Sequence, residues 1–374
     1  MSSEDTVLVV FPLDFARLDT GGLREKAVGL LRGANSFGIR WQVAYQFKGE
    51  IRISSSIDEI LKLEAPSFIK TKSTVAFQHL RFWRKLTDFC TERSYASCWV
   101  RIGVSTPQMY SFITSFKGPI FLDIPTYPFL AERRWGGKVL ALLTNPILKK
   151  IVDKCSYIVC PTSSEDQILG KPTINVGNGV DLDGIQLHYP AKLLDKPYVL
   201  LGFGQWSDWH GVDRLIIGIA DANRQSDYEI VLSGSGPALS SWKNLAKKHD
   251  VDFRILPPVY GAQRDALIEQ AHAGIGTLAT HRRELIVDSS LKNRMYLAYG
   301  LPFLVTNRDP LSEIANGIYQ LSDVDAPIDI DVLTSWLERV TRTRTQVAEE
   351  LRARAAHHSW TISYRNLYKA LKGK

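Results

Sequence analysis

Cysteine is scarce in this sequence, with 4 cysteines in 374 residues. None shows Cys-x-x-Cys spacing, and no paired histidines stand near them, which argues against a zinc site. The surrounding residues are apolar or mixed, so we expect reduced, buried thiols. The four are Cys90, Cys98, Cys155 and Cys160.

Long apolar runs are also missing. The longest candidates, residues 139–143 and 198–203, are far shorter than the roughly 18 to 20 residues that cross a bilayer. The first five residues, MSSED, lack the basic segment and the long apolar run of a secretory signal. We therefore expect a cytoplasmic protein, either free or at the inner face of the plasma membrane.

The composition is that of an ordinary globular protein of two domains. A length of 374 residues exceeds what one core usually supports, since domains mostly hold ~100 to 200 residues. The apolar share of 45% and charged share of 23% exclude a disordered, collagen-like or coiled-coil chain. A net charge of +7 suits a nucleotide diphosphate, an anionic membrane or nucleic acid, and charge alone does not choose among them.

Strand-like and helix-like segments alternate along the chain, which predicts parallel sheets. Residues 6–11 have the pattern of a strand covered on both faces, and Gly21-Gly22 then precedes a helix over 23–36. The alternation restarts after the polar stretch 181–197, so we expect two doubly wound sheets in succession. The other expected strands are 41–47, 97–102, 120–124, 157–160, 198–203, 229–233, 252–256, 274–278 and 303–306, and the expected helices of the second half are 211–223, 238–249, 262–273 and 290–299.

Two glycine-containing loops have the form of phosphate sites. Gly21-Gly22 stands before a helix that carries Arg24 and Lys26, where backbone amides and cations could converge on an anion. The segment 232–237, LSGSGP, follows a strand and opens a helix. Two adjacent glycines are a weak signal alone, and a plain tight turn explains LSGSGP equally well.

Two further segments are more specific. Residues 176–185 (VGNGVDLDGI) and 290–306 (SLKNRMYLAYGLPFLVT) resemble family 4 glycosyltransferases of the GT-B fold, particularly the bacterial polysaccharide-assembly members. The position of LSGSGP and the segment 209–215 (WHGVDRL) extend the similarity over the second half of the chain. The first half is similar more loosely, through Gly21-Gly22 and residues 122–129 (LDIPTYPF).

This resemblance implies an α/β protein with two Rossmann-like domains facing a central cleft. Residues 1–180 would bind the acceptor, residues 181–355 the nucleotide sugar, and residues 356–374 would form a C-terminal helix that crosses back to the first domain. The implied reaction transfers a sugar from a UDP-sugar or GDP-sugar to a saccharide or lipid-linked acceptor, with retention and without metal or cofactor. The spacing of Asp181 and Asp183 is that of a metal motif, but Asp181 is interpreted as part of the crossing motif.

The resemblance also implies site residues. Asp123, at a strand end, is the candidate for acceptor contact, although Asp123 or Thr126 could equally cap a turn. Asp123 and Lys292 are the candidate catalytic residues. The candidate donor-binding residues are Gly21, Gly22, Gly204, His210, Gly234, Ser235, Gly236, His281, Arg282, Glu284, Asp288, Ser290, Leu291, Lys292 and Met295.

The sequence departs from the family where the donor should bind. Gln205 and His210 stand where the family has an Arg and a Lys, so both usual phosphate cations are missing. Replacements could come from His281, Arg282, Arg283, Lys292 or Arg294, of which Lys292 is ranked first.

The paired glutamates of the family are missing as well. Met295 falls where the ribose-binding Glu belongs, and a methionine accepts no ribose hydroxyl hydrogen bond of useful strength. Val287 falls at the other Glu position, with Glu284 and Asp288 close by. Either the nucleotide binds in an altered way, or the chain is a non-catalytic partner of another transferase.

Two other functions are less consistent with the residues. A dinucleotide oxidoreductase would need a glycine at Ser207 after Gly202 and Gly204. The basic, aromatic run 81–85 has amphipathic helical spacing, which favours a core-packed or membrane-facing helix over a nucleic-acid surface. No nucleic-acid partner is expected, and peripheral membrane contact through this helix is a hypothesis.

Overall fold

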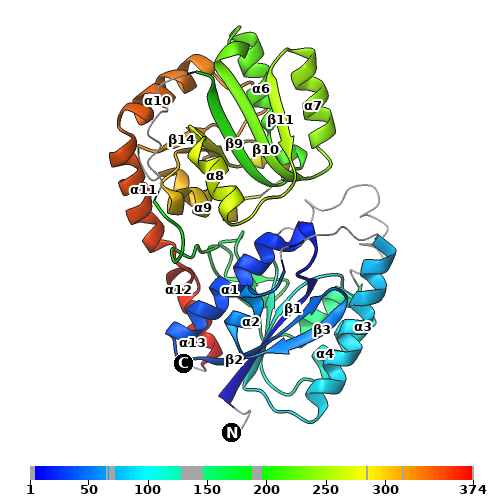
Figure 1. The fold of residues 1–374 in the computed structure, drawn as a ribbon. Helices are drawn as coiled ribbons and strands as arrows, with labels where there is room; N and C mark the ends of the chain where they lie inside the picture. Colours follow the sequence, from blue (N-terminus) through cyan, green and yellow to red (C-terminus); the bar gives the residue numbers. More distant parts are fainter. Residues whose placement is uncertain are drawn as a thin grey trace. The chain divides into compact units, whose positions relative to one another are not determined.

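The computed structural model describes residues 5–64, 66, 72–127, 146–187, 196–283, 285–313 and 316–372. The chain divides into two compact units, Met1–Gly179 with Trp360–Lys374, and Val180–Ser359. Figure 1 shows that each unit contains a sheet with helices beside it. The sequence-based division places the changes after residues 180 and 355.

The first unit is built on a mostly parallel sheet in the order β3-β2-β1-β4-β5-β6-β8-β7. Its central strand β1 pairs in parallel with β2 and β4 and is buried along most of its length, as its β-branched sequence predicts. The edge strands β3 and β7 run antiparallel to their neighbours. The strands are β1 (Thr6–Asp14), β2 (Arg40–Phe47), β3 (Glu50–Ser54), β4 (Ser97–Arg101), β5 (Ile120–Asp123), β6 (Tyr157–Cys160), β7 (Gln167–Ile168) and β8 (Lys171–Asn175).

The C-terminal helices return to the first unit and pack on α1. A Cβ added at Gly29 would lie 2.0 Å from Nε1 of Trp360, and one at Gly33 would lie 2.3 Å from the Tyr368 hydroxyl. The Tyr368 hydroxyl also donates a hydrogen bond to the Leu30 carbonyl at 2.9 Å. This confirms the crossing back of the C-terminal helix. The helices of this unit include α1 (Gly21–Ser36), α2 (Ile57–Leu61), α3 (Lys72–Thr91), α4 (Pro107–Ser115), α12 (Trp360–Ser363) and α13 (Arg365–Leu371).

The second unit has a sheet in the order β11-β10-β9-β12-β13-β14, with every pair parallel. All carboxyl ends therefore meet at one edge, and the strand order reverses between β9 and β12, where ligands of such sheets usually bind. The strands are β9 (Tyr198–Gln205), β10 (Tyr228–Ser235), β11 (Asp252–Leu256), β12 (Ala273–Ile275), β13 (Phe303–Thr306) and β14 (Ile318–Leu321). The helices are α6 (Val212–Asp221), α7 (Leu239–Lys248), α8 (Ala262–Glu269), α9 (Leu291–Tyr299), α10 (Ile330–Arg342) and α11 (Arg344–His357).

The structure corrects some of the expected elements. Gly21 and Gly22 do not precede the first helix but form its first turn. Strand β12 ends at Ile275 rather than 278, and β3 and β14 were not expected. Within the described residues, no helix is long and apolar enough to cross a membrane.

Candidate functional site

The carboxyl edge of the second sheet brings together the end of β9, the loop after β12 and the start of α9. Strands β9 and β10 pair to their last residues, where Gly204 lies opposite Gly234. Gly234 has φ +138°, and a Cβ on it would lie 1.9 Å from the Gly204 carbonyl oxygen. Gly236 has φ +150°, and its Cβ would lie 2.1 Å from the Trp206 carbonyl oxygen. These two glycines are thus required by the close approach of two loops, and contact of Gly204, Gly234, Ser235 or Gly236 with a ligand stays a prediction.

Trp206 connects the end of β9 with β10, α7 and the start of α9. Its side chain is fully buried, and Nε1 donates a hydrogen bond to the Ser233 carbonyl at 3.2 Å. The indole is edge-on to His210 and Trp242, with ring centroids 5.0 and 6.1 Å away. Its ring lies 4.4 Å from Nζ of Lys292. The buried indole therefore presents its face to the Lys292 ammonium.

Lys292 lies in the first turn of α9 and is 8% exposed. Among the residues that the structure describes, Nζ has no hydrogen-bond partner. Burial lowers the pKa of Lys292 to about 7, against the opposing effect of the Asp288 carboxylate. Ser290, at the N-cap of the same helix, makes no side-chain cap. A buried ammonium and a helix N-terminus thus occur together, and both favour an anion.

Asp288 lies just before this helix and is 4% exposed. Its Oδ2 makes no hydrogen bond to any part of the chain that is described. Burial raises the pKa of Asp288, and the Asp309 carboxylate raises it further, while Arg294, the nearby Thr277 hydroxyl and Lys292 lower it. The carboxyl group is therefore held where it could accept a hydrogen bond from a ligand hydroxyl.

The next two polar side chains of α9 already have a partner within the protein. Arg294 pairs with Asp309 at 2.6 Å, and the Asn293 amide donates to the same carboxylate at 2.7 Å. Met295 is partly buried against the core of the unit. Arg294 is thus neutralised within the protein, which leaves Lys292 as the cation of α9 without a carboxylate partner.

His210 also packs edge-on to Trp206. Nδ1 of His210 lies 3.0 Å from the Ser207 amide nitrogen and 3.1 Å from the Ser207 carbonyl oxygen, so it accepts from the amide in one tautomer and donates to the carbonyl in the other. Burial lowers the pKa of His210 well below its usual value, and the charge of Lys292 lowers it further. Trp209 stacks on the imidazole at 3.8 Å, and Arg283 lies over Trp209 at 4.3 Å. His210 is therefore a neutral N–H group where the family has a lysine.

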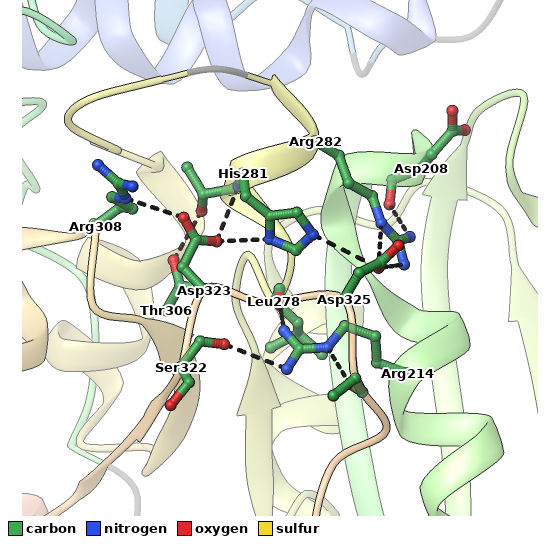
Figure 2. A network of polar contacts seen from close by, with 12 residues as sticks. Asp208, Arg214, Leu278, His281, Arg282, Thr306, Arg308, Ser322, Asp323 and Asp325 are labelled. Atoms are coloured by element: carbon green, nitrogen blue, oxygen red, sulfur yellow. Dashed lines mark hydrogen bonds and ion pairs between the residues drawn. The ribbon is translucent and has the colours of Figure 1, made fainter.

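A polar network next to this region holds two other predicted cations (Figure 2). His281 contacts Asp323 through its backbone amide at 2.8 Å and through Nδ1 at 2.9 Å. Arg282 forms two hydrogen bonds to Asp213, at 2.9 and 2.8 Å, and pairs with Asp325. These carboxylates raise the pKa of Arg282, with Asp213 the larger influence. Both predicted phosphate cations are thus matched by acidic groups of the same unit.

Arg214 fixes the loops that carry this network. Its guanidinium donates to the carbonyls of Leu278, Ser322 and Ala326. Leu278 follows β12, whereas Ser322 and Ala326 follow β14. One buried arginine therefore connects the two loops that carry His281 and Asp323. Sequence reasoning missed Trp206 and Arg214, because their partners are distant in the sequence. In the sequence, the position of Trp206 directly after Gly204-Gln205 was the signal that could have marked it as a site residue.

In the first unit, Asp123 is fully buried at the end of β5. Its Oδ2 pairs with Arg101 at 2.6 Å and with Lys26 at 3.4 Å. Burial lowers the pKa of Lys26 to about 8, and Asp123 partly offsets that effect. Arg24 donates to backbone carbonyls at the end of α2 and just beyond it, at Ile60, Leu61, Leu63 and Glu64. Neither cation converges on an anion site with Gly21-Gly22, contrary to expectation.

The remaining predicted residues lie at the starts of helices, in a local turn or outside the described residues. Gly21, Gly22, Ser290 and Leu291 lie in or next to the first turns of α1 and α9, whereas Glu284 lies outside the described residues. Asp181 accepts a hydrogen bond from the Asp183 amide at 3.1 Å, which is a local turn. No group of three or more His, Cys, Asp or Glu residues suited to a metal is found in the part of the chain that is described.

The fold resembles that of known glycosyltransferases. Over 98% of this chain and 99% of the other, it matches the apo lipopolysaccharide outer core galactosyltransferase WaaB, with TM-score 0.58 and 14% identity. Sucrose-phosphate synthase from Thermosynechococcus elongatus matches with TM-score 0.66 and 11% identity, over 99% of both chains. Anabaena HepE in complex with UDP and glucose matches with TM-score 0.66 and 11% identity, over 99% of this chain and 100% of that one. No family model and no curated protein sequence matches.

These similarities extend over both units and confirm the predicted fold class. The chain has the GT-B fold, with two parallel-sheet, Rossmann-like domains. At 10–14% identity the matches establish the fold alone.

Proposed function

We propose that this GT-B chain is a glycosyltransferase that moves a sugar from a nucleotide diphosphate to a saccharide or lipid-linked acceptor. The observation that carries the proposal is Lys292, a buried ammonium at a helix N-terminus with no hydrogen-bond partner among the described residues. Leaving a buried charge unpaired is costly, so a site that does so is suited to receive an anion. The position lies at the carboxyl edge of the second sheet, and a solved GT-B structure contains UDP and glucose.

In this proposal the donor diphosphate lies between α9 and the end of β9. Lys292 supplies the positive charge, and the first amides of α9 supply hydrogen bonds. As the glycosidic bond to the donor breaks, negative charge grows on the leaving diphosphate, and these groups stabilise it without a metal. The ring of Trp206 lies against the Lys292 ammonium and positions it.

The ribose needs a different partner from the glutamate of the family. Met295 supplies no carboxylate and packs against the core. Asp288, a buried carboxyl group just before α9, is the group of this region that we propose for a donor hydroxyl. A UDP-sugar or a GDP-sugar is equally compatible with these contacts.

We further propose that the reaction proceeds with retention and serves polysaccharide or glycoconjugate synthesis, as in the family that the sequence resembles. In the first unit, Asp123 acts indirectly. Its carboxylate holds Arg101 and Lys26 at the carboxyl ends of β4 and β5, and its complete burial argues against direct contact with an acceptor.

Met295 also favours a second candidate, a non-catalytic GT-B partner of another transferase. Such a subunit would not need the ribose contact. The buried charge of Lys292 is harder to explain in this case, because nothing would select for an unpaired ammonium.

A nucleotide screen separates the two candidates. We expect UDP or GDP to raise the thermal unfolding midpoint, and the matching nucleotide sugar to be slowly hydrolysed, with free sugar detected by chromatography. Stabilisation without sugar release under any donor and acceptor mixture would support the non-catalytic partner. No stabilisation by any nucleotide would contradict a donor site at Lys292.

A further inference from the structure

The first sheet has a reversal of strand order of its own, between β1 and β4. In parallel α/β sheets, ligands bind outside the carboxyl ends of the strands beside such a reversal. Arg101 is the last residue of β4, and its register partner Asp123 is the last residue of β5. Lys26 comes from α1, the α-helix that follows β1. Three charged side chains therefore meet at the edge of this unit where a ligand is expected.

These three side chains carry more positive than negative charge. Nη1 of Arg101 and Nζ of Lys26 both donate to Oδ2 of Asp123, at 2.6 and 3.4 Å. In the described part of the chain, neither cation has a second carboxylate partner. Burial lowers the pKa of Lys26 to about 8, so the protein holds this second cation at a cost. One carboxylate thus serves two cations, and an anionic ligand would balance the excess charge.

The hydrogen bonds of this cluster are not all made within the protein, as those of a purely structural ion-pair network usually are. Oδ1 of Asp123 and the hydroxyl of Tyr364 are buried and make no hydrogen bond to a described residue. The Tyr364 ring lies 5.7 Å from Nζ of Lys26, so it belongs to the same cluster. The cluster therefore keeps hydrogen-bonding capacity for a further polar group.

Arg101 connects the cluster with the surface. Its side chain is 10% exposed, against 2% for Lys26 and 0% for Asp123. Within the described residues, Nη1 is the guanidinium nitrogen that makes a hydrogen bond. Nε and Nη2 remain, and this pair of donors matches two oxygens of one phosphate or carboxylate. The chain reaches solvent just beyond, where Gly103 and Val104 are exposed.

We propose that the cluster of Lys26, Arg101 and Asp123 binds an oxyanion of the acceptor, so that the acceptor carries a phosphate or carboxylate group. Arg101 contacts the oxyanion, Lys26 acts through its charge, and Asp123 positions both cations. The description of this ligand as the acceptor rests on the proposed transfer reaction. The anion site itself does not depend on that reaction.

Isothermal titration calorimetry of the full chain tests the site, with glucose 6-phosphate and glucuronate as anionic probes and glucose as the neutral probe. All titrations use the Lys292→Ala background, so that the probes do not report on the proposed donor ammonium. We expect at least one anionic probe to bind roughly 10-fold tighter than glucose, or more. Tighter binding of glucose 6-phosphate identifies a phosphate site, and tighter binding of glucuronate identifies a carboxylate site.

Two variants each remove the excess charge and leave a balanced ion pair. Arg101→Gln should weaken the preferred anion by roughly 10- to 100-fold and stay folded in urea titrations, because Lys26 still pairs with Asp123. Lys26→Met keeps the guanidinium and should weaken binding by roughly 3- to 10-fold. The matched control is Arg40→Gln at the amino end of β2, where the arginine is 55% exposed and pairs with Asp5. Its loss of affinity should stay within about twofold.

Three results would overturn the proposal. Anionic probes that bind no tighter than glucose would show that no oxyanion is recognised. Equal losses in Arg101→Gln and Arg40→Gln would show a general effect of net charge. Unchanged affinity in a folded Arg101→Gln variant would place the anion elsewhere. With Lys292 intact, Arg101→Gln should bind UDP and GDP as the wild type does, and a failure of nucleotide binding alone would contradict the donor site but not this one.

Discussion

Lys292 is the residue on which the account of the donor site rests. The protein surrounds its ammonium with an indole face and a helix N-terminus, and the nearest acidic influence comes from a carboxyl group whose own pKa is raised. Arg282 and Arg294, by contrast, are matched by carboxylates. Among these three cations, Lys292 is therefore the one that an anionic ligand would pair with.

The pH dependence of nucleotide binding follows from this environment. Because burial lowers the pKa of Lys292 to about 7, the free protein loses the positive charge as pH rises through that value. We expect the affinity for UDP or GDP to fall as pH increases from about 6 to about 9, since only the ammonium attracts the diphosphate. Isothermal titration calorimetry across this range measures it. Lys292→Arg is the control, because arginine stays charged and its affinity should be nearly constant with pH.

The stability of the free protein should change in the opposite sense. The pKa of Lys292 is lower in the folded chain than its ordinary value of 10.5, so between about 7 and 10.5 the unfolded chain holds more protons. The contribution of Lys292 to the free energy of unfolding therefore rises with pH in this window. Urea unfolding of the wild type and of Lys292→Met measures it. An identical pH dependence in the two proteins would show that Lys292 is not buried as described.

At the scale of elements, the contact of α1 with the C-terminal helices is the clearest test of the fold. Alanine in place of a helical glycine normally stabilises by about 1 kcal/mol. At Gly29 the new Cβ would lie 2.0 Å from the Trp360 ring, so we expect Gly29→Ala to destabilise by about 1–3 kcal/mol instead. Urea unfolding gives the difference. Gly22→Ala, at an exposed position of the same helix, should be neutral or stabilising, and equal effects at both positions would argue against the packing of α12 on α1.

Most elements could be predicted from the sequence, because buried parallel strands have continuous apolar runs. Strands over 157–160, 252–256 and 303–306 were expected with the bounds that the structure has. The edge strand β3 was missed because its EIRIS sequence is half-buried and short. Strand β12 is shorter than expected, although the Gly276 amide still donates to the Leu304 carbonyl of β13 at 2.9 Å.

At the scale of the whole molecule, the fold was predictable from the sequence, whereas the partners within the site were not. The glycine and proline pattern of 290–306 was enough to locate Lys292 and the GT-B fold. The contact of Lys292 with Trp206 depends on β9 and α9 meeting at one sheet edge, which follows from strand order. The same holds for Arg282, whose carboxylate partners Asp213 and Asp325 come from distant segments. The sequence alone therefore identifies the candidate cations of the site but does not show which of them are paired with carboxylates of the protein.

The most direct test of the account is the equilibrium binding of UDP and GDP to the wild type, Lys292→Arg and Lys292→Ala at neutral pH. A charge-assisted contact with a diphosphate predicts that Lys292→Ala weakens binding by roughly 10- to 100-fold. Lys292→Arg should keep most of the affinity, and unfolding in urea should show that all three proteins are folded. Equal affinity of the wild type and a folded Lys292→Ala variant would contradict the donor site proposed at α9.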